Sequence, residues 1–283
     1  MSKKKILKQL PTYLALIVVL IIVVTPLIYT VSSSFKTNSE IMADPSRIFP
    51  ANPTFENYVK AWTSDVFDIN NMLFHSLYYT IICLIANVLT STMSGYVFAR
   101  SEFRGKKFWF AAFSMLMFFS MGSVTIYPMM DVLKFIHIPK NLHGLVFIRM
   151  FSLHIMNVYL VRSYVNSLPR ELDESAEIDG CSFIGIFFKI IAPLLKPIMA
   201  TIGILAFQSS WNDYLMPMIF TLGAPQQRPL IVGLVALSQS GESAASWNLV
   251  LAGATVSLIP VLLAYGFGNR YFVSGLSAGA VKG

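Results

Sequence analysis

Polar and aromatic side chains interrupt an otherwise apolar stretch at five nearby positions, Gln208, Trp211, Asn212, Asp213 and Tyr214. The rings of Trp211 and Tyr214 can stack on the flat face of a ligand, while Asn212 and Asp213 can exchange hydrogen bonds with its polar groups. The same groups can instead bond to neighbouring helices, since amides often fix helix packing inside membranes. The pattern therefore indicates either a contact with a polar solute or a packing network.

A second polar group lies in an earlier apolar block. His154 and Asn157 are three residues apart and would share one face of a helix. They can line a cavity, or His154 can be a packing histidine. Arg149 lies in the same block near its outer end, where its long side chain can extend toward the membrane surface.

Patterns for catalysis or metal binding are missing from the sequence. Cys83 and Cys181 are far apart and match no metal or redox spacing, and the four histidines are scattered. No nucleophile stands beside a base in a recognisable pattern, and no G-x-x-x-x-G-K-[ST] phosphate loop is present. We therefore expect no catalytic residue, no metal site, and no cofactor bound by this chain.

The elements that must position these side chains are membrane helices. Only 12% of the 283 residues are charged and 55% are hydrophobic, whereas soluble domains carry about 25% charged residues. The net charge of +7 is spread between apolar blocks and forms no single basic face, which excludes nucleic acid as a partner. Blocks long enough to span a bilayer cover 12–31, 72–98, 108–130, 142–161, 194–220 and 249–267. The sequence predicts an all-α integral membrane protein with six transmembrane helices.

The distribution of basic residues predicts the orientation. With six spans, the segments on the side of the termini hold 14 Lys and Arg, and those on the other side hold six. The positive-inside rule therefore places both termini in the cytoplasm. The long first outside loop contains a predicted short amphipathic helix over 54–62, capped by Thr54.

The cytoplasmic segment between the fourth and fifth spans has the pattern of a short helix. Pro169 suits a first helical turn, acidic residues follow it at the favourable end of the helix dipole, and Gly180 suits a left-handed C-cap. Beyond it, an apolar stretch is stopped or bent at Pro193 and Pro197. This segment is either a rigid element that transmits a push or a solvated acidic loop.

The same segment carries a resemblance to a known family. Glu174-Ser-Ala176, then Gly180, then Ile190-x-Ala192-Pro193 resembles the E-A-A-x3-G-x9-I-x-L-P signature of the membrane subunits of binding-protein-dependent ABC importers. Ser175 and Ala192 depart from that signature, and both are small. Segments 33–40, 54–58, 95–107, 211–214 and 270–283 resemble the carbohydrate-importer subfamily, particularly the second permease of maltose-type importers.

The resemblance implies a subunit of an ATP-driven carbohydrate importer in a bacterial-type plasma membrane. Its partners would be a homologous second permease, two cytoplasmic ATPase subunits that bind ATP and Mg, an extracytoplasmic carbohydrate-binding protein, and membrane lipid. Segment 174–180 would be the coupling helix that contacts the ATPase. The residues implied in that coupling are Glu174, Ser175, Ala176, Asp179, Gly180 and Pro193, and tail residues that would reach the ATPase pair are Gly279, Lys282 and Gly283.

The expected organisation has three parts. Residues 1–71 hold the N-terminal segment, first span and outside loop, residues 72–268 hold the permease core, and residues 269–283 form a Gly-rich cytoplasmic tail. Helix 174–180 would couple the translocation pathway to the ATPases. The alternative is a stand-alone secondary carrier or channel for a small polar solute, in which only Asp213 could serve as the ion-coupling carboxylate.

Overall fold

The computed structural model describes residues 3–64, 67–118, 122–239 and 243–280, and every regular element in these ranges is helical. The chain divides into two compact units. The first combines Met1–Asn70 with Gly233–Ile259, and the second combines Asn71–Val232 with Pro260–Gly283. The candidate site residues with described side chains all lie in the second unit.

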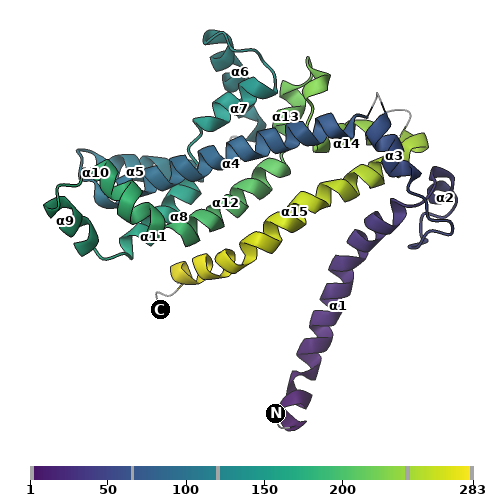
Figure 1. Ribbon diagram of the computed structural model, residues 1–283, viewed down its shortest axis with the longest axis horizontal. Helices are drawn as coiled ribbons and strands as arrows, with labels where there is room; N and C mark the ends of the chain where they lie inside the picture. The colour runs from purple at the N-terminus through teal and green to yellow at the C-terminus, as the bar shows by residue number, and fades with distance from the viewer. Residues whose placement is uncertain (1–2, 65–66, 119–121, 240–242, 281–283) are drawn as a thin grey trace. The chain divides into compact units, whose positions relative to one another are not determined.

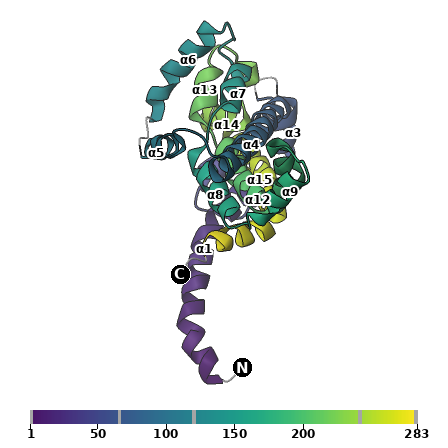
Figure 2. The same ribbon diagram turned by 90° about the vertical axis from the view of Figure 1, so that its left-hand side faces the viewer.

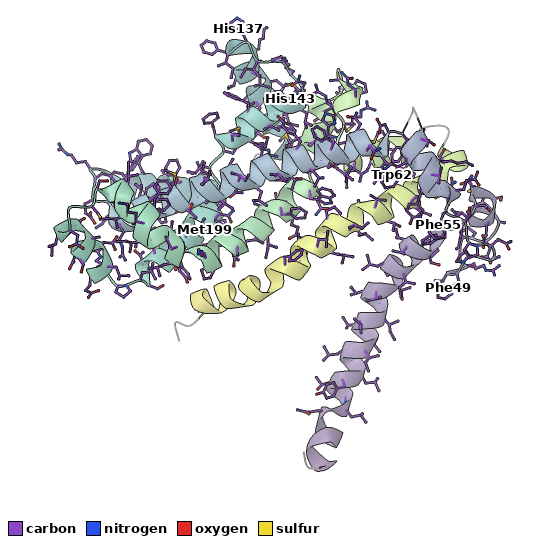
Figure 3. All side chains as sticks on the ribbon, viewed as in Figure 1. Phe49, Phe55, Trp62, His137, His143 and Met199 are labelled. Atoms are coloured by element: carbon purple, nitrogen blue, oxygen red, sulfur yellow. The ribbon has the colours of Figure 1, made fainter. Side chains whose placement is uncertain are left out.

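The first unit is built on one long apolar helix, coloured purple in Figure 1. It contains α1 (Lys3–Ser33), α2 (Asn38–Ala43), α3 (Glu56–Thr63), most of α14 (Leu230–Gln239) and the first part of α15 (Ser243–Ala280). The side chain of Asn57 donates to the carbonyls of Ser34 and Lys36, at 2.7 Å each, and accepts from Asn248 at 2.7 Å. This amide therefore fastens α3 to the end of α1. The predicted helix over 54–62 is present as α3, but the predicted cap at Thr54 is wrong, because the helix begins at Glu56 and its N-cap residue is Phe55. Phe55 and Trp62 are both exposed (Figure 3).

The second unit is a set of long and broken helices. Its elements are α4 (Ile69–Arg100, apart from its first two residues), α5 (Lys106–Leu116), a 3-10 turn (Gly122–Thr125), α6 (Ile126–Phe135), α7 (Leu142–Met150), α8 (Ile155–Asn166), α9 (Glu171–Ile178), α10 (Phe183–Ile186), a π-helical segment (Phe187–Ile191), α11 (Ala192–Leu194), α12 (Lys196–Trp211), α13 (Leu215–Phe220) and a second 3-10 turn (Pro225–Gln227). The last part of α15 belongs here too.

Helix α4 is the longest helix that begins and ends within residues 69–232, and α8 and α12 pack along it (Figures 1 and 2). A Cβ atom on Gly95 would lie 2.6 Å from the side chain of Val161 in α8. Only glycine therefore allows the approach of these two helices. A Cβ atom on Gly203 of α12 would lie 3.8 Å from the side chain of Val88 in α4, an ordinary van der Waals distance.

The membrane-spanning candidates agree only in part with the six predicted blocks. Within the described ranges, four segments are long and apolar enough to cross a bilayer: Gln9–Ser33, Ile69–Arg100, Leu142–Asn166 and Ser246–Gly268. A fifth is a pair of helices, Phe183–Leu194 and Lys196–Trp211, bent by 80°. The predicted third block, 108–130, is divided among α5, the 3-10 turn and α6, because the chain leaves the helix after Leu116.

Candidate functional site

Helix α9 forms where the sequence predicts a short cytoplasmic helix, and its C-terminus is closed by Gly180. Gly180 has φ +78°, in the left-handed region that glycine adopts without penalty. Its N–H donates to the carbonyl of Glu177 at 3.0 Å, and the N–H of Cys181 donates to Ala176 at 2.9 Å. This pair of bonds is the Schellman arrangement. The predicted glycine cap is therefore confirmed.

A buried ion pair fastens α9 to the end of α4. Asp173 lies 2.9 Å from Nε of Arg100, and the two side chains are 12% and 6% exposed. The hydroxyl of Tyr96 donates to the other carboxylate oxygen at 3.3 Å. Arg100 also donates to the carbonyl of Leu168 at 2.9 Å. Since both charges are removed from solvent and further bonded, α9 is held in one position relative to α4.

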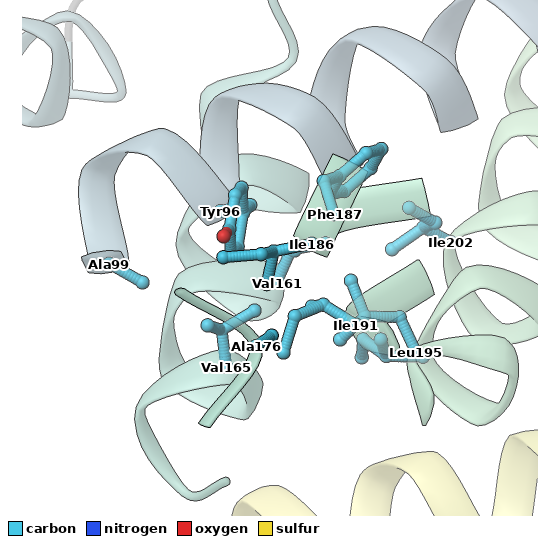
Figure 4. Close-up of a cluster of buried hydrophobic side chains, with 11 residues drawn as sticks. Tyr96, Ala99, Val161, Val165, Ala176, Ile186, Phe187, Ile191, Leu195 and Ile202 are labelled. Atoms are coloured by element: carbon cyan, nitrogen blue, oxygen red, sulfur yellow. The ribbon is translucent and has the colours of Figure 1, made fainter. Parts of the chain in front are cut away.

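An apolar cluster lies under α9, and we call it the Tyr96 core (Figure 4). Its buried members are Tyr96, Ala99, Val161, Val165, Ala176, Ile186, Phe187, Ile191, Leu195, Ile198 and Ile202. Ala176 is 4% exposed, so its small side chain permits α9 to pack on its own chain. The ring of Tyr96 stacks on Phe183 with centroids 4.7 Å apart.

The bend predicted at Pro193 and Pro197, in the chain that follows α9, is also present. Pro193 lies in α11 and is exposed, and Pro197 lies in the first turn of α12. The 80° change in helix direction falls between them, at Leu195. Because a proline cannot donate a helical N–H bond, two of them at this spacing favour a break.

The two sides of α9 differ in exposure. Ser175 and Asp179 are exposed, whereas Ala176 faces the core with Asp173. Glu174 is exposed, and Ile178 is 86% exposed, the largest apolar exposure on this helix. The surface available to another protein is therefore acidic, with one unpartnered apolar side chain at its end.

A second apolar cluster, the Tyr79 core, lies at the other end of the second unit. Its buried members are Tyr79, Cys83, Ile126, Leu133, Leu142, Leu145, Val146 and Phe220. Helix α4 contributes to both cores. Two other stretches of chain run from one core to the other, and each is broken on the way. The break between α7 and α8 covers 151–154, and the break between α12 and α13 covers 212–214.

A charged pair joins these two interruptions. Arg149, near the end of α7, donates to a carboxylate oxygen of Asp213 at 2.9 Å. The hydroxyl of Tyr79 donates to the same oxygen at 2.7 Å. The expectation that Arg149 extends toward the membrane surface is therefore wrong, because a carboxylate 64 residues later lies within reach. Asp213 is likewise engaged inside the protein.

A cavity of about 500 Å³ lies beside the interruptions. Its polar lining comes from Asn87 of α4, His154 and Asn157 at the start of α8, and Ser209 of α12. The amide of Asn157 donates to Asn87 at 2.9 Å, which orients both side chains. The spacing of His154 and Asn157 correctly placed them together, whereas Asn87 and Ser209 come from helices whose pairing the sequence does not reveal.

The polar and aromatic side chains over 208–214 do not line one common cavity. Trp211 is 6% exposed, and its ring stacks on Phe207 with centroids 5.6 Å apart. Asn212 caps α12 by donating to the carbonyl of Gln208 at 3.0 Å. Gln208 and Asn212 are exposed, and Tyr214 is half-buried. Trp211 and Asp213 therefore have partners within the protein. Of the two interpretations of this pattern, the packing network is the one that fits these two residues.

The tail is helical over most of its length. Gly279 lies in the last turn of α15, which continues through Ala280, whereas Lys282 and Gly283 lie outside the described residues. Among the residues that the structure describes, no group of three or more His, Cys, Asp or Glu side chains could hold a metal ion. His137, which follows α6, and His143, in the first turn of α7, are separate from any such group (Figure 3).

Comparison with known proteins identifies the relatives of the chain. A family model described as "Binding-protein-dependent transport system inner membrane component" matches residues 91–277. The galactooligosaccharides transport system permease protein GanQ of Bacillus subtilis is 31% identical, with 100% of this chain and 99% of that protein covered. The maltodextrin transport system permease protein MdxG of the same organism is 29% identical over 100% and 99% of the two chains.

A solved structure has the same fold. It is a chain in the crystal structure of a bacterial ABC transporter involved in the import of the acidic polysaccharide alginate, with a TM-score of 0.82. The match covers 96% of this chain and 99% of that chain, at 23% sequence identity. The arrangement of helices described above is therefore one that a known transporter chain adopts.

Proposed function

The chain belongs to the family of binding-protein-dependent transport system inner membrane components, and on that premise we propose that it is a permease subunit of an ATP-driven oligosaccharide importer. The observation that carries this proposal is the end-to-end similarity to permeases named for oligosaccharides. A stand-alone carrier is not favoured. Such a protein leaves α9 without a role and needs an ion-coupling carboxylate, whereas Asp213 is held by Arg149.

In the proposed topology the chain crosses the membrane six times, with both termini in the cytoplasm. Four segments and the bent pair supply five crossings, and α5 with the elements that follow it would supply the sixth. The excess of basic residues on the side of the termini supports this orientation. Residues 1–71 would then hold the N-terminal cytoplasmic segment, the first span and the outside loop. Residues 72–268 would be the permease core, and residues 269–283 the cytoplasmic tail.

The proposed assembly contains a second permease, two ATPase subunits that bind ATP and Mg, and an extracytoplasmic carbohydrate-binding protein. Helix α9 would contact the ATPase through its exposed Glu174, Ser175 and Asp179. Gly180 and Pro193 would act indirectly, by ending α9 and by bending the chain beyond it. Gly279, Lys282 and Gly283 would make a further contact from the tail.

The mechanism that this geometry supports is a rigid-body movement. Because Asp173 and Ala176 hold α9 against α4 and the Tyr96 core, displacement of α9 by an ATPase would carry that core with it. The interruptions at 151–154 and 212–214 lie where the Tyr96 and Tyr79 cores could move relative to each other. The cavity beside them would change shape in the same movement.

The proposed function has a direct test. The tagged chain, purified from its native membrane, is expected to bring down an ATPase subunit, and membrane vesicles are expected to take up a labelled oligosaccharide only when ATP is supplied to the cytoplasmic face. A panel of galactose-, arabinose- and glucose-containing oligosaccharides identifies the substrate. Uptake that continues without ATP, and without any ATPase in the purified sample, would refute the importer assignment.

The cavity lined by Asn87, His154, Asn157 and Ser209 is the proposed part of the substrate path. Its amide, imidazole and hydroxyl groups suit a neutral, hydroxyl-rich solute. Ser209 is exposed and borders the cavity, so S209F would fill space without disturbing a buried contact. We expect S209F to lower oligosaccharide uptake more than about tenfold, which corresponds to about 1.4 kcal/mol on the transport barrier.

The matched control is S163F, which places the same ring on an exposed position of α8 away from the cavity lining. We expect S163F to transport normally, and both variants to purify with the ATPase. Uptake by S209F equal to that of S163F would remove the cavity from the substrate path while leaving the importer assignment intact.

A further inference from the structure

A second cavity, of about 570 Å³, lies where α4 ends and α5 begins. Lys106 and Lys107 from the first turn of α5, with Arg162 from α8, give it three basic side chains. The rings of Phe98, Phe103 and Phe110 supply apolar walls. A volume of this size suits a small organic ligand or headgroup, and nothing in the proposed transport cycle uses it.

The cavity carries an excess of positive charge. Glu102 is the one acidic residue in its lining, and it lies 3.4 Å from Lys106. Within the described part of the chain, Lys107 and Arg162 form no ion pair. The first turn of α5 contains no acidic residue, although a helix N-terminus favours negative charge. An anion in this cavity would therefore neutralise positive charge that the described acidic residues of the chain leave unpaired.

Two contacts within the protein fix the orientation of the Arg162 guanidinium. Its Nε donates to the carbonyl of Phe98 at 3.3 Å, and its guanidinium carbon lies 3.9 Å from the centre of the Phe110 ring. The stem is thereby fixed, and the two terminal nitrogens remain available to donate. Arginine in such a position matches the oxygens of a phosphate group, to which it can donate two parallel bonds.

The level of the cavity in the bilayer points to the source of the phosphate. The span Ile69–Arg100 ends immediately before this turn, so Lys106 and Lys107 lie at the membrane edge. Farther along α5, Phe108 and Trp109 are 68% and 51% exposed, which suits contact with lipid. An occupant could therefore place its charge among the basic residues and its chains along the apolar face of α5.

We propose that this cavity binds the phosphate headgroup of an anionic phospholipid, with Lys106, Lys107 and Arg162 contacting the phosphate. Phe98, Phe103 and Phe110 border the beginning of the acyl chains. The proposal is independent of the transported substrate. In the proposed topology the site faces the cytoplasmic leaflet, where anionic lipids attract basic segments near the membrane surface.

The test measures lipid binding to the purified full-length chain by native mass spectrometry. The probes are dioleoylphosphatidylglycerol, dioleoylphosphatidylcholine and inorganic phosphate, each titrated separately. We expect phosphatidylglycerol to bind more tightly than phosphatidylcholine. K107Q should weaken phosphatidylglycerol binding about fivefold and E102Q should strengthen it about fivefold, because each changes the charge of the cavity by one unit. Glu102 is exposed, so a gain in affinity by E102Q cannot result from misfolding.

The control variant K140Q removes an exposed lysine outside the cavity and should leave both lipid affinities unchanged. Equal binding of the two lipids by the wild-type chain would overturn the proposal. So would K107Q and E102Q binding phosphatidylglycerol as the wild type does. If inorganic phosphate binds as tightly as phosphatidylglycerol, and K107Q weakens both equally, the site takes free phosphate and the lipid assignment is overturned.

Discussion

Replacing Asp173 with alanine is expected to lower the free energy of unfolding by about 3–5 kcal/mol and to abolish uptake, because it leaves the buried charge of Arg100 without its partner. The side chain of Arg100 is 6% exposed, and its Nε lies 2.9 Å from a carboxylate oxygen of Asp173. Loss of this pair also leaves the Tyr96 hydroxyl without its acceptor. Thermal unfolding in detergent, followed by uptake in vesicles, measures both effects.

A double replacement separates the effect of the ion pair from general damage. R100L/D173L replaces both charges with apolar side chains, and we expect it to recover most of the stability lost by D173A. E177Q, which removes an exposed charge from the same helix, is the matched control and should change neither stability nor uptake. Stability of D173A within about 0.5 kcal/mol of the wild type would contradict the role of this pair.

Gly180→Val should separate ATP hydrolysis from transport. The position has φ +78°, and a Cβ atom added there would meet no other residue within 4 Å, so the penalty arises from the backbone and not from a clash. A left-handed conformation costs a side-chain-bearing residue about 1–2 kcal/mol, which shifts the population of the capped form of α9 about 5- to 30-fold. We expect uptake to fall by that factor while the chain still inserts and ATP is still hydrolysed.

The control substitution at the same position is Gly180→Asn. Asparagine tolerates the left-handed region better than other non-glycine residues, so G180N should retain most of the coupling. Uptake and ATP hydrolysis are measured on the same vesicles, which gives the number of ATP molecules consumed per sugar. A G180V transporter with the wild-type ratio would show that the cap of α9 does not serve coupling.

The parts of the structure that depend on local sequence could be predicted. Gly180 and the acidic first turn set the ends of α9, and Pro193 and Pro197 mark the bend, because caps and prolines act on the residues beside them. The prediction of one membrane-spanning helix over 108–130 was wrong. Hydropathy reports how apolar a stretch is and contains no information on where its backbone turns away from a helix.

The contacts between distant helices could not be predicted. Nothing near Arg149 in the sequence indicates that Asp213 will be its partner, and the choice between Trp211 as a ligand platform and as a packing residue depends on Phe207 and the neighbouring helices. The direction of Ala176 likewise depends on how α9 is placed against α4. Pairing of helices decides all three, and a single sequence does not record it.

The Arg149–Asp213 pair has a consequence for biosynthesis. The two residues are 64 positions apart, and translation at about 5–20 residues per second separates their synthesis by about 3–13 s. In the proposed topology, Arg149 would enter the bilayer during that interval without its carboxylate. An unpaired charge costs about 2.5–3.5 kcal/mol at the centre of a membrane helix and less toward its end. The later segment that carries Asp213 would therefore complete the charge balance of the earlier one, and a chain truncated before Asp213 would leave Arg149 without its partner.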